Sequence, residues 1–324
     1  MIEMPTFPDD QWYLVQVKKL FMNGNVADKN VEQRFRGSLM ETELINVLST
    51  VITPSDVATV LPGTNIFEKL VLAPFPILKN IFSKFGSRFF QRKDMKNGKS
   101  VWVVKDEWKL FGKAYDKLIS RHINIKLIEQ YGIKCCPYCN ENYIFNRKMK
   151  SGAQLDHFFS KEQYPLFALS LYNLVPSCTT CNHIKQEKKL KLSPHDHTRD
   201  FDHMRITYTP NNIQWVTDFH TLNIDFQYDP ADIGFQKDME VNEKQLLLKA
   251  AYQNHRDYAQ EIINKAFWYN NTSIEAFLNS LLGAFGSKEE ILRIAFGNYV
   301  EQSELLKRPL SKMTRDLLIE LKIL

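Results

Sequence analysis

Residues 134–191 read KCCPYCNENYIFNRKMKSGAQLDHFFSKEQYPLFALSLYNLVPSCTTCNHIKQEKKLK, and they contain all five cysteines of the chain. Two CxxC pairs lie in this stretch, Cys136 with Cys139 and Cys178 with Cys181. Each pair places two thiolates on one side of a metal, and four thiolates complete the tetrahedron that structural Zn²⁺ prefers. In a reducing compartment, cysteines paired in this way indicate a metal site before disulfides. The sequence therefore predicts a structural zinc site.

Cys135 is the fifth cysteine and has no CxxC partner of its own. It could replace Cys136 in a CxxxC arrangement, but we favour a non-ligating neighbour because CxxC is the usual zinc spacing. Four buried, reduced cysteines without a metal are the remaining alternative. A closed site of four thiolates has no open coordination position, so its zinc is expected to stabilise the fold. Any catalytic group must then lie elsewhere.

The segment between the two pairs carries a second set of polar residues. Asp156 and His157 follow a short apolar run, Asn173 leads another, and Asn182 comes directly after the last cysteine with Lys185 three residues on. In these positions the sequence resembles the HNH, or ββα-metal, nuclease family. The resemblance covers about 55 to 60 residues, including the cysteine pairs. It implies two short strands followed by a helix.

The resemblance also implies a role for each residue. Hydrolysis of a phosphodiester needs a water, a base that deprotonates it, and a cation that neutralises the leaving oxygen. His157 would be the base, because a neutral imidazole accepts a proton at physiological pH. Asp156 and Asn182 offer the hard oxygen ligands that suit Mg²⁺ or Mn²⁺. Asn173 would hold the intervening loop and so orient His157.

Two points stay open in this assignment. Neighbouring residues on a regular strand point to opposite faces, so Asp156 and His157 can face one metal only where the strand ends or twists. His183 is a rival to Asn182 as metal ligand, although it is rotated by about 100° on the helix. We favour Asn182, which occupies the position next to the cysteine.

The helix after the second pair is expected from about Thr179 to Leu190, and it is rich in lysine. Lys185, Lys188 and Lys189 would form a basic stripe that contacts substrate phosphates, and a merely solvated face is the alternative. The later segment SPHDHTRD, with His195, Asp196 and His197, is interpreted as a loop with at most a supporting role.

The flanks predict an α+β protein that is mainly α-helical. Residues 1–128 are expected to be a helical region with perhaps five helices, because apolar residues recur at three- and four-residue spacing in segments such as 31–52 and 106–132. Residues 129–200 would form the HNH core. Residues 201–324 would add a small hairpin over 204–228, with a turn at 210–212, and helices from about 242 onward.

The segment 80–100, NIFSKFGSRFFQRKDMKNGKS, combines lysines and arginines with four phenylalanines. It could grip a phosphate backbone. We favour an amphipathic helix whose phenylalanines are core and whose basic residues are solvated.

Composition sets the broad class. The chain has 44% hydrophobic and 24% charged residues, a formal net charge of +5 and no uncharged run of membrane length. A mildly basic balance permits a phosphate-bearing partner without requiring one. The start, MIEMPTFPDDQW, lacks the pattern of a secretory signal, so a cytoplasmic protein is expected.

The expected function is an endonuclease acting on DNA, with RNA as a second substrate. A zinc-stabilised module that binds nucleic acid without cutting it is the alternative. The segments LDHFFSKEQYPLFALSLYNLVPSCTTCN and FGNYVEQSELLKRPLSKMTRDLL further resemble HNH effectors of antiphage systems of the Septu type. That resemblance implies a partner ATPase. A restriction or mobile-element nuclease is the other setting.

Overall fold

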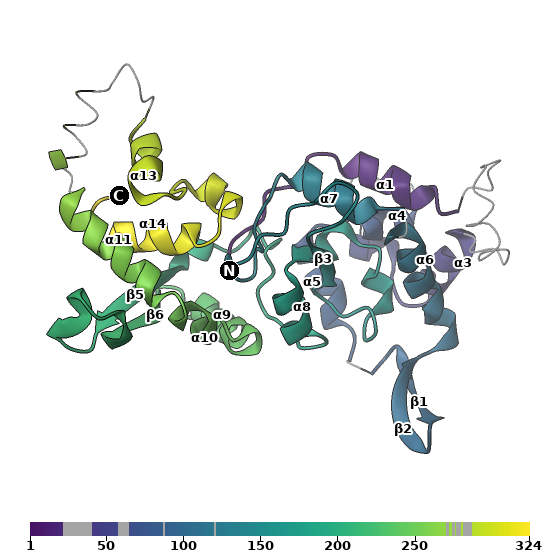
Figure 1. The fold of residues 1–324 in the computed structure, drawn as a ribbon. Helices are drawn as coiled ribbons and strands as arrows, with labels where there is room; N and C mark the ends of the chain where they lie inside the picture. Colours follow the sequence, from purple (N-terminus) through teal and green to yellow (C-terminus); the bar gives the residue numbers. More distant parts are fainter. Residues whose placement is uncertain are drawn as a thin grey trace.

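The computed structural model describes residues 1–21, 41–57, 65–86, 88–119, 121–269, 272–273, 276, 280 and 287–324 (Figure 1). The described elements up to residue 200 gather around β3 and α8, and the later ones form a second group, with the N-terminus between the two (Figure 1). Buried hydrophobic side chains form one continuous cluster through both groups. Helices and small two-stranded sheets together make an α+β fold, as expected.

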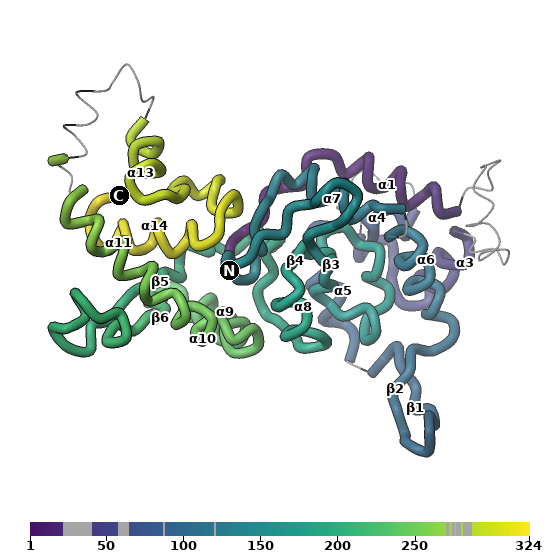
Figure 2. The backbone as a smooth tube through the Cα atoms, in the orientation of Figure 1, coloured from purple at the N-terminus to yellow at the C-terminus, as the bar shows by residue number. Residues whose placement is uncertain are grey.

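The N-terminal region is mostly helical and packs around the central strands (Figure 2). Its helices are short because prolines and glycines interrupt the apolar pattern; Pro74, for example, immediately precedes a helix, and Gly132 ends one in a left-handed conformation. The expected helical residues 31–40 and the break at Pro62-Gly63 lie outside the described residues. The elements are α1 (Asp10–Lys18), α3 (Glu41–Ser49), η1 (Pro54–Val57), α4 (Ile66–Val71), α5 (Phe75–Ser83), η2 (Asp106–Trp108), α6 (Lys109–Ile119) and α7 (Ile123–Tyr131).

A β-hairpin replaces the helix expected over 80–100. Helix α5 ends at Ser83, and strands β1 (Gln91–Lys96) and β2 (Lys99–Val104) then pair antiparallel. Asn97 and Gly98 form the two-residue turn, with φ of 52° and 74°. Both values are positive, as a type I′ turn requires, and Asn-Gly is the sequence that favours it. The amphipathic helix predicted over 80–100 was therefore wrong beyond Ser83.

The central unit consists of two short strands and a helix. Strands β3 (Gln154–His157) and β4 (Leu174–Ser177) pair antiparallel, with Asp156 opposite Val175 and His157 opposite Leu174. Helix α8 (Thr179–Lys185) follows directly. The two strands match the expected ones, but the helix ends before Leu190 because Gln186 adopts a positive φ of 46°. Two 3₁₀ turns, η3 (Pro165–Phe167) and η4 (Leu171–Asn173), lie between the strands.

The C-terminal group begins with the expected antiparallel pair, β5 (Met204–Pro210) and β6 (Leu222–Tyr228). The turn expected at 210–212 is wrong, because the connection continues through two 3₁₀ helices and leaves Ile213 84% exposed. Helix α14 packs on β5, where Asp316 accepts a hydrogen bond from the Ile206 amide at 2.9 Å. The elements of this group are η5 (Phe201–His203), η6 (Ile213–Val216), η7 (Phe219–Thr221), α9 (Ile233–Leu246), α10 (Leu248–Gln253), α11 (Arg256–Trp268), α13 (Lys288–Phe296), η8 (Gln302–Lys307) and α14 (Ser311–Glu320).

Among the described residues, none of the helices has both the length and the apolar character needed to cross a bilayer.

Candidate metal centre and polar site

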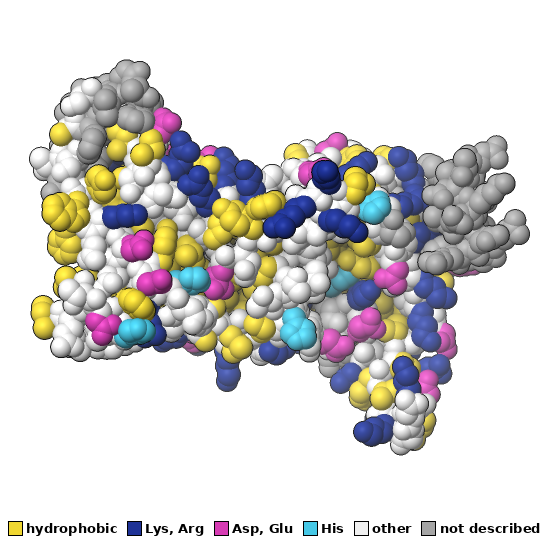
Figure 3. All heavy atoms as spheres, viewed as in Figure 1, with side chains coloured by type: hydrophobic (Ala, Val, Ile, Leu, Met, Phe, Trp, Pro, Cys, Tyr) yellow, Lys and Arg dark blue, Asp and Glu magenta, His cyan; other side chains and the backbone are white. Residues whose placement is uncertain are grey.

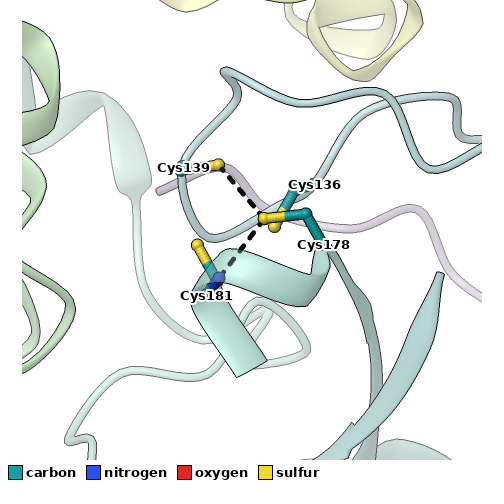
Figure 4. Close-up of side chains that lie close together, drawn as sticks. All are labelled: Cys136, Cys139, Cys178 and Cys181. Carbon is teal, nitrogen blue, oxygen red and sulfur yellow. Dashed lines mark hydrogen bonds between the residues drawn. The ribbon is translucent and has the colours of Figure 1, made fainter. Parts of the chain in front are cut away.

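Four sulfur atoms converge where the 136–139 turn meets the start of α8 (Figure 4). The Sγ atoms of Cys136, Cys139, Cys178 and Cys181 all lie within 4.8 Å of one another, and those of Cys139 and Cys178 are 3.9 Å apart. A zinc ion with Zn–S bonds of about 2.3 Å holds its sulfurs about 3.8 Å apart, whereas a disulfide requires about 2.05 Å. The cysteines are free and buried, so the group can hold a metal such as zinc.

Local hydrogen bonds prepare these sulfurs for a cation. The Cys178 sulfur accepts from the Cys181 amide at 3.4 Å and caps the first turn of α8. The Asn142 side chain donates to the sulfurs of Cys139 and Cys178 at 3.9 and 3.6 Å. Metals bind thiolates, so donors directed at sulfur favour the ligating form.

Cys135 does not belong to the four-sulfur group, which confirms the choice of Cys136 over Cys135. Its backbone amide donates to the carbonyl of Leu306 at 3.0 Å, and its side chain is buried. Burial raises the pKa of its thiol to about 12. Cys135 is therefore a neutral packing residue beside the metal group.

Asp156 lies beneath α8 and is 4% exposed. Its carboxylate accepts hydrogen bonds from the Tyr138 hydroxyl at 2.7 Å and from the Lys185 ammonium at 3.0 Å. Burial raises the pKa of Asp156, while Lys185 and Tyr138 act in the opposite direction. The ion pair keeps a charged carboxylate in the interior only because both partners are provided.

Lys185 is fully buried, which contradicts its predicted role as a phosphate contact. Its ammonium donates to the Asp156 carboxylate and to the carbonyl of His157 at 2.8 Å. Both contacts are internal, so no free face remains for substrate. Helical spacing from Asn182 brings Lys185 onto the face of α8 that covers β3, and that face is the interior.

His157 is 9% exposed, and its ring has one fixed hydrogen bond. Nε2 lies 3.0 Å from the carbonyl of Ala168. A carbonyl only accepts, so Nε2 carries the proton and the lone pair is on Nδ1. The Tyr115 ring packs edge-on against the imidazole, with centroids 4.4 Å apart. Burial lowers the pKa of His157 to about 3, so the ring is neutral at physiological pH.

Asn173 is fully buried at the base of the loop that follows β3. Its side-chain oxygen accepts from the Phe159 amide at 2.8 Å. Its side-chain nitrogen donates to the carbonyls of Phe159 and Phe167 at 3.2 and 3.0 Å. Ala168, the partner of His157, directly follows this segment. These contacts hold the loop, and the orientation of His157 by Asn173 stays a prediction.

Asn182 lies on α8, about one helical turn before Lys185. Its amide donates to Gln154 Oε1 at 2.5 Å, and Gln154 shares a face of β3 with Asp156 because strand residues alternate. His157, by the same alternation, packs instead against Ala168 and Tyr115. The strand therefore does not turn Asp156 and His157 toward one point.

The Mg²⁺ or Mn²⁺ site predicted at Asp156 and Asn182 does not fit this arrangement. The Lys185 ammonium already neutralises Asp156, and a dication placed beside it would be repelled. The rival ligand His183 is exposed and makes no hydrogen bond within the described part of the chain. The cysteine group is the only candidate cluster of metal-binding side chains among the described residues.

Lys185, Lys188 and Lys189 do not form the predicted basic stripe on one helix face. Helix α8 ends at Lys185, so Lys188 and Lys189 do not continue its face. The ammonium of Lys188 donates to the carbonyl of Gln245 at 3.3 Å. That of Lys189 donates to the Tyr164 hydroxyl at 3.0 Å. Lys188 is exposed and Lys189 lies against aromatic rings, so each makes its own packing contact.

The 195–197 segment is a loop, as expected. His195 is buried, and its Nε2 donates to the carbonyl of Leu174 at 3.0 Å, which ties the loop to β4. Burial lowers the pKa of His195 to about 4. Asp196 is buried and pairs with Lys79 at 3.6 Å, while exposed His197 pairs with Glu3 at 2.5 Å.

Three contact residues of the site were not identified from the sequence. Tyr138 lies inside the first CxxC pair and binds Asp156, Gln154 binds Asn182, and Tyr115 comes from distant α6 to pack on His157. The position of Tyr138 between two predicted ligands is the one signal that was available. The roles of Tyr115 and Gln154 depend on tertiary packing, which has no local pattern.

Comparisons of the chain with protein-family models, with curated proteins and with solved structures found no match.

Zinc content tests the four-sulfur group. We expect about one zinc ion per purified chain, and Cys178→Ser should lose most of it because three thiolates bind more weakly than a closed set of four. Cys135→Ser is the matched control and should keep its zinc, as measured by elemental analysis. A metal-free parent chain, or loss of zinc in the control alone, would refute the assignment.

Substitution of Lys185 tests the buried ion pair. Lys185→Met should lower the free energy of unfolding by about 3–5 kcal/mol, because it leaves Asp156 buried without its cation. Exposed Lys188→Met should change it by less than about 0.5 kcal/mol. Denaturant titration measures both, and adding Asp156→Asn to Lys185→Met should recover part of the loss. Equal, small effects of the two lysine variants would contradict the ion pair.

The pH dependence of stability tests buried His195. Its pKa is about 4 in the folded state, below the ordinary 6.5, so the unfolded chain binds more protons between these values. The unfolding free energy is therefore unaffected by this group above pH 6.5. It falls by an amount of the order of 3 kcal/mol as the pH drops from 6.5 toward 4, because protonation then favours the unfolded chain. His195→Gln should flatten the fall in unfolding free energy between pH 7 and 5, while exposed His183→Gln should not. Identical slopes for parent and His195→Gln would rule this out.

Proposed function

We propose that the chain is an HNH-type phosphodiesterase that cuts nucleic acid, with His157 as the base that deprotonates the attacking water. The observation that carries the proposal is the fixed tautomer of His157. Nε2 is held by Ala168, and Nδ1 accepts no hydrogen bond from the described residues and is not sealed from solvent. A neutral, oriented imidazole with one free lone pair is what a general base needs.

The order of elements supports the same proposal. The first strand ends in His157, and its antiparallel partner follows Asn173. The next element is a helix that starts at the second cysteine pair. This is the order that the resemblance to HNH nucleases implies. The pKa of about 3 makes His157 a weak base in the free protein. A phosphodiester bound next to it is negatively charged and raises that pKa, which strengthens the base in the complex.

Mg²⁺ or Mn²⁺ at Asp156 and Asn182 is part of this proposal only if Lys185 leaves the carboxylate. The closed Asp156–Lys185 pair therefore favours a second candidate function. In that case the chain is a zinc-stabilised module that binds nucleic acid without cutting it. The resemblance to Septu-type effectors adds a setting to the first candidate, in which the nuclease acts in antiphage defence with a partner ATPase.

Cleavage by a His157 variant decides between the two. The parent chain, incubated with duplex DNA or RNA and Mg²⁺ or Mn²⁺, should cut it, and His157→Ala should be slower by about 10²–10⁴-fold because the base is gone. His220→Ala, an exposed histidine far along the chain, is the control. Both variants should keep zinc and melting temperature. Undiminished cutting by His157→Ala would exclude His157 as the base, and no cutting by the parent would favour the binding module.

A further inference from the structure

The β1–β2 hairpin projects from the body of the molecule (Figures 1 and 2). Residues 88–105 hold six basic side chains and one acidic one, an excess of five that equals the formal net charge of the whole chain. Basic side chains gather on this projection in the space-filling view (Figure 3). The basic residues are Arg88, Arg92, Lys93, Lys96, Lys99 and Lys105.

Apolar side chains of the hairpin are exposed along with the charges. Met95 is 68% exposed and Trp102 is 42% exposed. The register puts Lys93 opposite Trp102, and the Arg88 guanidinium lies 4.7 Å from the centre of the same ring. Lys96 and Lys99, which flank the turn, form no ion pair with any described residue. A strand pair that exposes both its faces and carries uncompensated charge is typical of a surface for a polyanion.

The dimensions of the hairpin favour one polyanion over others. Six-residue strands extend about 20 Å at roughly 3.4 Å per residue. The major groove of B-form DNA is about 12 Å wide and admits a two-stranded ribbon, whereas the major groove of duplex RNA is too narrow for side chains to read. We propose that the β1–β2 hairpin binds duplex DNA, with the ribbon in the major groove and its lysines on the phosphates.

The base of the hairpin connects it to the candidate site. Phe90 is fully buried against Trp108, with ring centroids 4.6 Å apart. The Gln91 side chain donates to the carbonyl of Glu162 at 2.8 Å. Glu162 belongs to the loop between β3 and β4, whose far end supplies the Ala168 carbonyl that fixes His157. The base of the hairpin is therefore attached to the loop that holds His157, and the inference that bound DNA reaches His157 rests on the proposed function.

DNA binding by the full-length chain tests the hairpin apart from catalysis. The His157→Ala chain, without added divalent cation, is titrated into a fluorescent DNA duplex of about 20 base pairs, and anisotropy is followed at several salt concentrations. Adding Lys96→Gln and Lys99→Gln should weaken binding by roughly tenfold and reduce the slope of log affinity against log salt by about 2, one unit for each lost phosphate contact.

The matched control removes the same charge elsewhere. Lys237→Gln with Lys244→Gln, both exposed on α9, should leave affinity and slope unchanged. Equal losses in the two double variants would reduce the effect to net charge and overturn the proposal. So would unchanged binding by the hairpin variant, or preferential hairpin-dependent binding of duplex RNA or single strands. Because cleavage is measured separately on the parent chain, a failed nuclease and a failed DNA contact are distinguishable.

Discussion

The convergence of four cysteine sulfurs is the constraint on which the centre of the molecule depends. It joins a turn that precedes β3 to the first turn of α8 and so fixes the helix over the strand pair. The same turn is bound from the C-terminal group, because the Tyr252 hydroxyl donates to the carbonyl of Cys139 at 2.7 Å and Asn140 accepts from the Lys312 amide at 3.0 Å. A metal here would stabilise both the site and the junction of the two groups.

The cysteine turn also reaches the polar site through Tyr138. Burial raises the pKa of its hydroxyl above the ordinary value, so it stays protonated and donates to Asp156. Lys185 closes the other side of that carboxylate from α8, whose start the cysteines hold. A buried carboxylate is stable only when each of these donors is in register. The metal group and the ion pair therefore specify one position of α8 relative to β3.

Local patterns predicted the parts of this structure that depend on spacing. The cysteine set, the two central strands and the β5–β6 pair could be identified because pairing and alternation are visible in the sequence. The burial of Lys185 was missed because lysine is almost never fully buried. The β1–β2 hairpin was missed because the four phenylalanines of 80–100 suggested a helix, although Asn97-Gly98 is a local turn signal. For Lys185 the tertiary partner Asp156 decided the outcome, whereas the hairpin follows from a local turn.

Two neighbouring lysines affect the proposed base, His157. Burial is the main cause of its low pKa, and the positive charges of Lys161 and Lys185 lower it further. Lys161 and Lys185 thus help to keep the imidazole unprotonated when no substrate is present. Phosphates bound beside the ring would offset those positive charges and raise the pKa. The proposed base would then gain strength in the complex and stay weak in the free protein, so that substrate binding itself raises its reactivity.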